Sequence, residues 1–249
     1  MTRPDADGKR VVSLAPSATA TLDAMGASDG LVGATLHCDT DVPAVGGWLN
    51  PDYDHLAELD PELVCTSDAL QREVRDELRS RGYRVHHVEP ATLSDVLDSF
   101  AEIGEAVGRP DAGEALRAGA EARLDAVADC VADRAADELR PVVYCEEWSD
   151  PPMAAGNWVP DAVVAAGGRY PFVESGERSH EVDRETVVSA DPDHAILHVC
   201  GRGDRVDPSV VTDRDWAIDP EVHVVDDSLL NQPSPRLVDG IETLADLLH

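Results

Sequence analysis

The second half of the 249-residue chain repeats the order of sequence patterns found in its first half. Each half opens with a short apolar run that predicts a strand, at 11–14 and at 141–145, and a helical pattern follows each run. Later, each half has a short helical pattern, then Asp-Pro, then another apolar run, with the Asp-Pro pairs beginning at Asp60 and Asp191. Asp-Pro alone is a common turn signal, but four features in the same order favour a duplicated unit. The repeat therefore predicts two similar α/β lobes with a ligand cleft between them.

Strand patterns that alternate with helix patterns predict a mainly parallel sheet in each lobe. In the first half the strand patterns lie at 11–14, 31–35, 62–66 and 84–88, and the helix patterns at 18–25, 69–81 and 93–107. In the second half the strand patterns lie at 141–145, 194–199 and 222–225, and the helix patterns at 158–166, 184–190 and 235–248.

An alanine-rich stretch at 111–139 has an apolar residue at every third or fourth position, which predicts one helix of about 40 Å. Two shorter helices with a turn near Gly119 are the alternative. We therefore expect an N-terminal lobe at 9–108, a linking helix within 109–139 and a C-terminal lobe at 140–249.

The chain is strongly acidic, with 50 acidic and 20 basic residues and a formal net charge of −30. Self-repulsion of this size strains a compact state at low salt, whereas molar salt shortens the Debye length to about 3 Å. The charge thus indicates a halophilic protein, and it argues against nucleic acid as a partner because nucleic acid needs a basic surface. No apolar run reaches the roughly 18 residues of a membrane span.

The first nine residues are polar and show no apolar signal core, so we expect a cytoplasmic protein, or an exported or cell-surface protein if a leader has been removed. The five cysteines form no CxxC pair and predict free thiols. The chain has no GxSxG, HExxH, P-loop or GxGxxG motif, which favours a binding protein over an enzyme. We expect a monomer.

Potential metal ligands follow several predicted strands, and ligands of open α/β sheets bind beyond the carboxyl ends of the strands. These residues are His37 and Cys38 after the strand at 31–35, Glu147 after that at 141–145, and His198 and Cys200 around the end of that at 194–199. Arg202 follows the same strand end and is a candidate contact for a bound ligand, not for a metal. Thiolate, imidazole and carboxylate are ligands for zinc, iron or copper. His37, Cys38, His198 and Cys200 are therefore candidate metal ligands, although small cysteines at strand ends can also simply pack.

Three of the four tryptophans lie in loops rich in glycine or proline, where a core aromatic would be unusual. These are Trp48, Trp148 and Trp158, and we interpret them as an exposed surface for a flat or bulky apolar ligand. Trp216 is expected to pack. Ser17 follows the first strand and is expected to cap the next helix, in a position that also makes it a candidate ligand contact.

Several stretches resemble the helical-backbone, or class III, periplasmic binding proteins, which include the cobalamin and iron-chelate receptors that feed ABC importers. The stretches that carry this resemblance are 10–19, 45–51, 59–64 and 182–193. Residues 37–39, 150–160 and 231–240 are similar to a leaderless branch of cobalamin-binding proteins.

The resemblance implies a protein that binds a cobalamin-like corrinoid or another metal chelate in the cleft, without chemistry, through Ser17, Trp48, Glu147, Trp148, Trp158 and Arg202. It also implies one acidic residue per lobe that docks to an ABC permease, and Glu73 and Glu185 match best by position. The alternatives are a cytosolic metal-binding protein or metalloenzyme that holds a bare transition metal at Cys38, Cys200, His37 and Glu147, or a receptor-like domain that signals through a partner.

Overall fold

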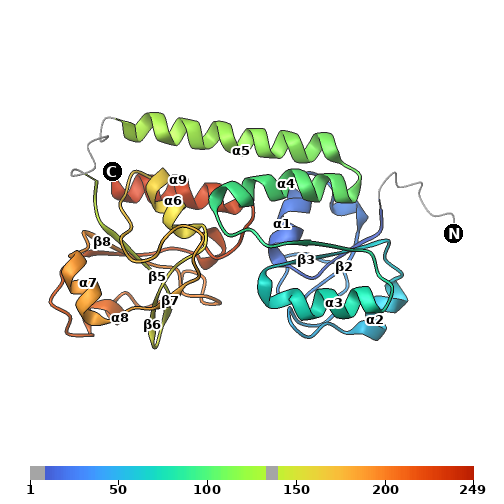
Figure 1. Cartoon of the computed structure of the whole chain (residues 1–249), viewed down its shortest axis with the longest axis horizontal. Coiled ribbons are helices and arrows are strands. Elements are labelled where there is room, and N and C mark those ends of the chain that lie inside the picture. Colours follow the sequence, from blue (N-terminus) through green and yellow to red (C-terminus); the bar gives the residue numbers. More distant parts are fainter. Residues whose placement is uncertain (1–8, 133–139) are drawn as a thin grey trace. The chain divides into compact units, whose positions relative to one another are not determined.

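The structure is a computed structural model that describes residues 9–132 and 140–249. These residues form two compact units (Figure 1). Unit 1 contains residues 9–90 and 97–119, and unit 2 contains residues 91–96, 120–132 and 140–249. The expected ligand cleft between the lobes stays a prediction.

Unit 1 has a four-stranded parallel sheet in the order β2-β1-β3-β4. Its strands are β1 (Val11–Ser13), β2 (Leu31–Ala34), β3 (Leu63–Ser67) and β4 (Val85–Val88). Its helices are α1 (Pro16–Ala24), α2 (Tyr53–Leu59), α3 (Arg72–Ser80) and most of α4 (Leu93–Val107), and short 3-10 turns lie at Ser28–Gly30 and Ala69–Gln71. The predicted strands and helices of this half are thus present.

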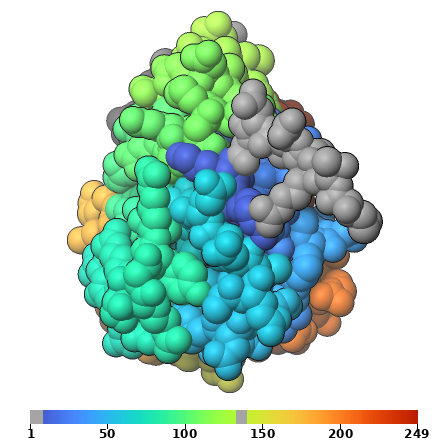
Figure 2. Space-filling model, turned by 90° about the vertical axis from the view of Figure 1, so that its right-hand side faces the viewer, coloured from blue at the N-terminus to red at the C-terminus, as the bar shows by residue number. Residues whose placement is uncertain are grey.

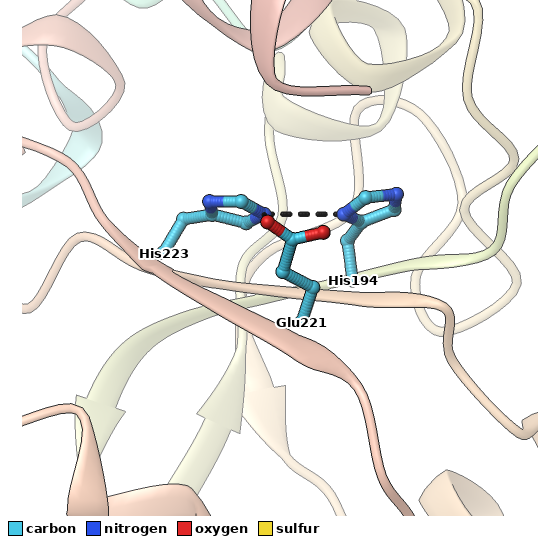
Figure 3. Close-up of side chains that lie close together, drawn as sticks. All are labelled: His194, Glu221 and His223. Carbon is cyan, nitrogen blue, oxygen red and sulfur yellow. Dashed lines mark hydrogen bonds and ion pairs between the residues drawn. The ribbon is translucent and has the colours of Figure 1, made fainter. Parts of the chain in front are cut away.

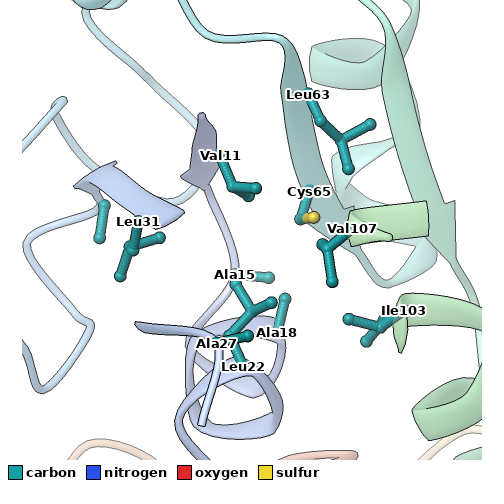
Figure 4. Close-up of a cluster of buried hydrophobic side chains, with 11 residues drawn as sticks. Val11, Ala15, Ala18, Leu22, Ala27, Leu31, Leu63, Cys65, Ile103 and Val107 are labelled. Atoms are coloured by element: carbon teal, nitrogen blue, oxygen red, sulfur yellow. The ribbon is translucent and has the colours of Figure 1, made fainter. Parts of the chain in front are cut away.

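The core of unit 1 consists of two apolar clusters, because successive residues of a strand face opposite sides of the sheet. Val11 of β1 lies in the cluster beneath α1 and α4, together with the β3 residues Leu63 and Cys65 (Figure 4). Val12 and Val64, the next residues along these strands, lie in the second cluster, which includes side chains of α2 and α3. Residues of α2, α3 and their neighbours, cyan to green, cover much of the face seen in Figure 2.

Unit 2 has a five-stranded sheet in the order β7-β6-β5-β8-β9. Its strands are β5 (Val143–Ser149), β6 (Pro152–Ala154), β7 (His180–Glu181), β8 (His194–Leu197) and β9 (Glu221–Val224). Its helices are α6 (Val159–Ala165), α7 (Arg184–Ala190), α8 (Ser209–Thr212) and α9 (Arg236–Leu248), and a 3-10 turn lies at Asp227–Leu229.

The sheet of unit 2 is mixed, which the strand patterns did not predict. Strands β5, β8 and β9 are parallel, but β6 and β7 extend the sheet with antiparallel pairs. Strands β5 and β6 form a hairpin, with Ser149 opposite Pro152. Strands β6 and β7 have only three and two residues, which is too few to give a strand pattern, so pairing with the neighbouring strand supplies their structure.

One continuous helix, α5 (Pro110–Val131), occupies the alanine-rich stretch. It passes through Gly119 without a turn, so the single-helix prediction is confirmed and the two-helix alternative is wrong. Its 22 residues span about 33 Å. The expected continuation at 133–139 lies outside the described residues.

The internal repeat is visible in detail at α2 and α7. Each helix has seven residues, an aspartate N-cap whose side chain accepts backbone N–H groups, and an aspartate C-cap in the left-handed region. The C-caps are Asp60 and Asp191, both with φ of 46° and both followed by proline. Each Asp-Pro pair then leads into the central strand next to the first strand of its unit, β3 beside β1 and β8 beside β5.

Candidate functional site

The carboxyl end of the unit 1 sheet exposes a group of apolar side chains, which we call the apolar rim: Leu36, Trp48, Leu49 and Leu70. The three leucines are 71%, 50% and 56% exposed, and Trp48 is half-buried. The three leucines are among the five exposed large hydrophobic residues in the described part of the chain. Clustered apolar exposure of this kind marks a binding surface more than a scattered single leucine does.

A buried glutamine holds the rim in place. The Gln71 side-chain amide donates hydrogen bonds to the backbone carbonyls of Leu14, at 2.8 Å, and Trp48, at 2.7 Å. Its side-chain oxygen accepts a bond from the backbone N–H of Ser67. Gln71 thus ties the Trp48 loop to the ends of β1 and β3. Sequence reasoning identified Trp48 but missed Gln71 and the leucines, because exposed leucines have no sequence signal that separates them from core leucines.

The structure places Ser17 differently from the prediction. Helix α1 begins at Pro16 and its N-cap is Ala15, so Ser17 is the second helical residue and the capping role is wrong. Ser17 is 6% exposed, and its backbone carbonyl accepts a bond from the Thr21 hydroxyl. Its assignment as a ligand contact stays a prediction.

His37 and Cys38 lie in the turn after β2, next to the rim. His37 is exposed, whereas the half-buried Cys38 sulfur accepts a hydrogen bond from the Thr19 hydroxyl at 3.1 Å and lies 3.4 Å from that of Thr35. Two hydroxyls therefore orient the thiol. Its role as a metal ligand stays a prediction.

A hollow of about 530 Å³ lies in unit 2, beyond the ends of β5 and β8, and this is a usual size for a small-molecule site. It is lined by Trp148, Ser149, Asp150, Val199, Cys200, Arg202, Val206, Asp207 and Val210. The structure thus brings together three predicted residues, Trp148, Cys200 and Arg202. Trp148 is 48% exposed, and its indole N–H donates to the Asp150 carbonyl at 2.9 Å, which fixes the ring.

The loop after β8 forms one wall of this hollow and is held by side chains that sequence reasoning did not single out. The Asp227 carboxylate accepts bonds from the backbone N–H groups of Gly201 and Gly203, at 2.8 and 2.7 Å. Both glycines have positive φ, which side-chain-bearing residues rarely adopt. The Asn231 amide donates to the His198 carbonyl at 2.9 Å. The loop that carries Cys200 and Arg202 is therefore held in place by Asp227 and Asn231.

His198 is buried rather than open to a ligand. It has no exposed surface, its Nδ1 atom is hydrogen-bonded to Asn231, and burial lowers its pKa to about 4. Cys200 as a residue is exposed, but its sulfur is partly covered. This partial burial, followed by the charges of Asp227 and Glu147, raises the pKa of the thiol, so the thiol is protonated at neutral pH. Burial also raises the pKa of Glu147. Within unit 2 the described residues do not bring His198, Cys200 and Glu147 together as three metal ligands.

Trp158 lies in the interior of unit 2, so the expectation that it is exposed is wrong. It is 5% exposed, and its indole N–H donates to the Leu230 carbonyl at 2.7 Å. Trp216 packs against the apolar cluster of unit 2 and beneath the Arg214 guanidinium, as predicted. A loop tryptophan next to a helix start can turn inward when a carbonyl is there to accept its N–H.

The two candidate docking residues both lie in the first turn of a helix, although the repeat counterpart of α7 is α2 and not α3. Glu73 in unit 1 and Glu185 in unit 2 are both exposed, and each is the second residue of its helix, α3 or α7, directly after an arginine. Docking itself stays a prediction. No helix in the described residues has the length and apolar character to cross a membrane.

Comparison with known proteins gives a consistent result. Residues 11–218 match the family described as periplasmic binding protein. A cobalamin-binding protein from Halobacterium salinarum is 29% identical over 264 residues, which cover 98% of this chain and 70% of the relative.

Two solved structures share the fold. A periplasmic heme-binding protein from Roseiflexus sp. RS-1 aligns with a TM-score of 0.80 at 23% identity, over 96% of this chain and 97% of that one. A periplasmic vitamin B12-binding protein of Vibrio cholerae aligns with a TM-score of 0.73 at 21% identity, over 97% of this chain and 96% of that one.

Proposed function

Because the chain belongs to the periplasmic binding protein family, we propose that it binds a cobalamin-like corrinoid or another metal chelate with a large apolar face, and that it performs no chemistry on this ligand. The observation that carries the proposal is the apolar rim at the carboxyl end of the unit 1 sheet. The cobalamin-binding relative and the heme- and B12-binding structures support a macrocyclic metal chelate as the ligand class.

The apolar rim fits the face of a macrocycle. Its exposed leucines project from separate loops, after β2 and before α3, and together with Trp48 they offer an apolar surface wider than one side chain. Burying a half-exposed leucine contributes about 1 kcal/mol. The rim can therefore contribute several kcal/mol to the binding free energy. The entropy cost of ordering the Trp48 loop on binding is small, because Gln71 already holds this loop in the free protein.

The hollow in unit 2 offers contacts of a different kind for such a chelate. The Trp148 ring supplies an apolar face, and the exposed Arg202 supplies a positive charge in a chain with few of them. A chelate with carboxylate or phosphate groups would pair with this guanidinium. The protonated Cys200 thiol lies in the same wall and acts as a small lining group unless a metal displaces its proton.

We further propose that the protein serves as the substrate-binding component of an ABC-type uptake system, or is an intracellular relative of one. Glu73 and Glu185 would then present one carboxylate on each unit to arginines of a permease. Their exposure in the first turn of a helix in each unit supports this assignment.

A titration with cobalamin, its precursor cobinamide and hemin in molar potassium chloride tests the binding proposal. Tryptophan fluorescence should fall saturably with one ligand per chain, because Trp48 and Trp148 lie at the proposed surfaces. Trp216→Phe should leave the change intact, whereas Trp148→Phe should reduce it. The absence of saturable quenching by all three chelates would overturn the proposal, and the ranking of the three affinities identifies the ligand.

A further inference from the structure

Three potential metal ligands meet at the amino ends of β8 and β9, an edge of the unit 2 sheet that the proposed function does not use. His194 opens β8 and pairs directly with Glu221, which opens β9. His223 is two residues further along β9, so it lies on the same face as Glu221. The three side chains are therefore placed side by side by the register of two neighbouring strands.

Their donor atoms are close together. Nδ1 of His194 and Nε2 of His223 are 3.1 Å apart, and the Glu221 carboxylate lies 3.8 Å from Nε2 of His223. All three donor atoms lie within 4.8 Å of one another, and Figure 3 shows both rings and the carboxylate turned toward a common point. In a tetrahedral zinc site with bonds of about 2.05 Å, neighbouring donors are about 3.3 Å apart. The two imidazole nitrogens already have nearly this spacing.

The side chains are accessible from solvent. Glu221 is exposed and both histidines are half-buried, so an ion can reach the group from solvent. An imidazole offers a metal one ring nitrogen, and here each ring turns one nitrogen toward the other.

We propose that His194, Glu221 and His223 form a binding site for a divalent transition metal. Two imidazoles and one carboxylate match zinc, with water in the remaining position. In the described part of the chain this is the only group of three such ligands within that distance. It is also separate from the hollow, because His194 begins β8 whereas Cys200 and Arg202 follow its other end.

A metal here would join β8 to β9. It would bind the folded chain in preference to the unfolded chain, and it would therefore raise the melting temperature as its concentration increases. The site would thus stabilise unit 2 independently of the chelate.

Zinc titration of the chelator-stripped protein by calorimetry tests this proposal, with cobalt(II) as a spectroscopic probe of tetrahedral coordination. The wild type should bind one zinc ion per chain. His194→Asn and His223→Asn should each weaken binding by about 100-fold or more, since even the loss of an indirect ligand contact costs 10–100-fold. The matched control His180→Asn changes an exposed histidine of β7 in the same unit and should bind zinc as the wild type does.

A second variant separates this site from the thiols. Cys38→Ser combined with Cys200→Ser should retain the zinc affinity and the cobalt spectrum. Zinc binding that is lost in this variant but kept in the histidine variants would overturn the proposal, as would no zinc binding by the wild type. Titration of the histidine variants with the chelate that binds the wild type verifies their fold, and its outcome is independent of the zinc result.

Discussion

Arg214 donates two hydrogen bonds to the carboxylate of Glu146, which is completely buried in unit 2. The hydroxyls of Tyr144 and Ser149 donate to the same carboxylate, at 2.9 and 2.6 Å. Arg214 also donates to the Ser149 carbonyl, and Ser149 lines the hollow. The pair therefore fixes the end of β5 on which Trp148 stands.

Replacing Arg214 with alanine should lower the free energy of unfolding by about 3–5 kcal/mol, because Glu146 then remains as an unpaired buried charge. Urea unfolding in molar potassium chloride measures the change. Arg123→Ala is the control, since Arg123 pairs near the surface with the exposed Asp239 and the half-buried Glu242, and its loss should cost under about 1 kcal/mol. Equal losses of unfolding free energy in the two variants would contradict the expected difference between the buried and the surface ion pair.

Substitutions of Trp148 and Trp158 should have different effects, the first on chelate affinity and the second on the stability of the fold. Trp148→Ala should weaken chelate binding by about tenfold with little effect on unfolding, because the ring is half exposed. Trp158→Ala should cost about 3–5 kcal/mol of stability, because it empties a buried site and leaves the Leu230 carbonyl without its donor. Chelate titration and thermal unfolding of both variants distinguish the roles. The opposite pattern would refute this assignment.

The rim leucines should contribute to affinity in proportion to the surface they bury. Leu36→Ser, Leu49→Ser and Leu70→Ser should each raise the dissociation constant several-fold, which corresponds to about 1 kcal/mol. Val164→Ser, at an equally exposed apolar residue on α6, should leave affinity unchanged. Fluorescence titration measures the chelate affinity of each variant. If the leucine variants lose no more affinity than Val164→Ser, the rim is not part of the binding surface.

Charge reversal at the docking residues should affect partner binding alone. Glu73→Arg combined with Glu185→Arg should abolish capture of a permease while the chelate affinity stays the same. Glu58→Arg with Glu174→Arg makes the same charge change at two other exposed glutamates and should leave capture intact. A pull-down with the purified permease measures this, and equal capture by both double variants would reject the docking role.

His198 should make unit 2 sensitive to acid. Burial lowers its pKa to about 4, whereas an unfolded histidine has a pKa of about 6.5. The unfolded chain therefore binds more protons between these values, so stability present above about pH 6.5 is lost as the pH falls toward 4. The loss is of the order of 3 kcal/mol.

Unfolding measured between pH 7 and 4 tests this linkage. His198→Asn should lose stability at pH 7 but show a shallower decline on acidification. His180→Asn, an exposed control, should follow the wild type. Parallel pH profiles for wild type and His198→Asn would show that another group is responsible.

The sequence predicts the fold well because its signals are local. Asp60 and Asp191 each precede proline at the end of a helix, and both adopt the same left-handed conformation in the structure. Apolar periodicity likewise predicts α5 and the parallel strands. The short strands β6 and β7 are different, since β6 owes its structure to pairing with β5 and β7 owes its structure to pairing with β6.

The candidate site is less predictable, because its members depend on contacts between distant segments. Trp158 turns inward toward Leu230, which is 72 residues away. His194 and His223 meet only through the register of β8 and β9. Trp148, Cys200 and Arg202 are found from sequence since each lies near a strand end, where parallel sheets expose their loops.

The side-chain amide of Gln71 is uncharged, and this affects how the rim responds to salt. In a chain with a formal charge of −30, ion pairs strengthen and weaken as the surrounding salt changes. The bonds from Gln71 to the carbonyls of Leu14 and Trp48 involve no formal charge, and the residue is fully buried. The shape of the rim therefore does not depend on the salt concentration, so the same apolar surface is present when a cell gains or loses salt.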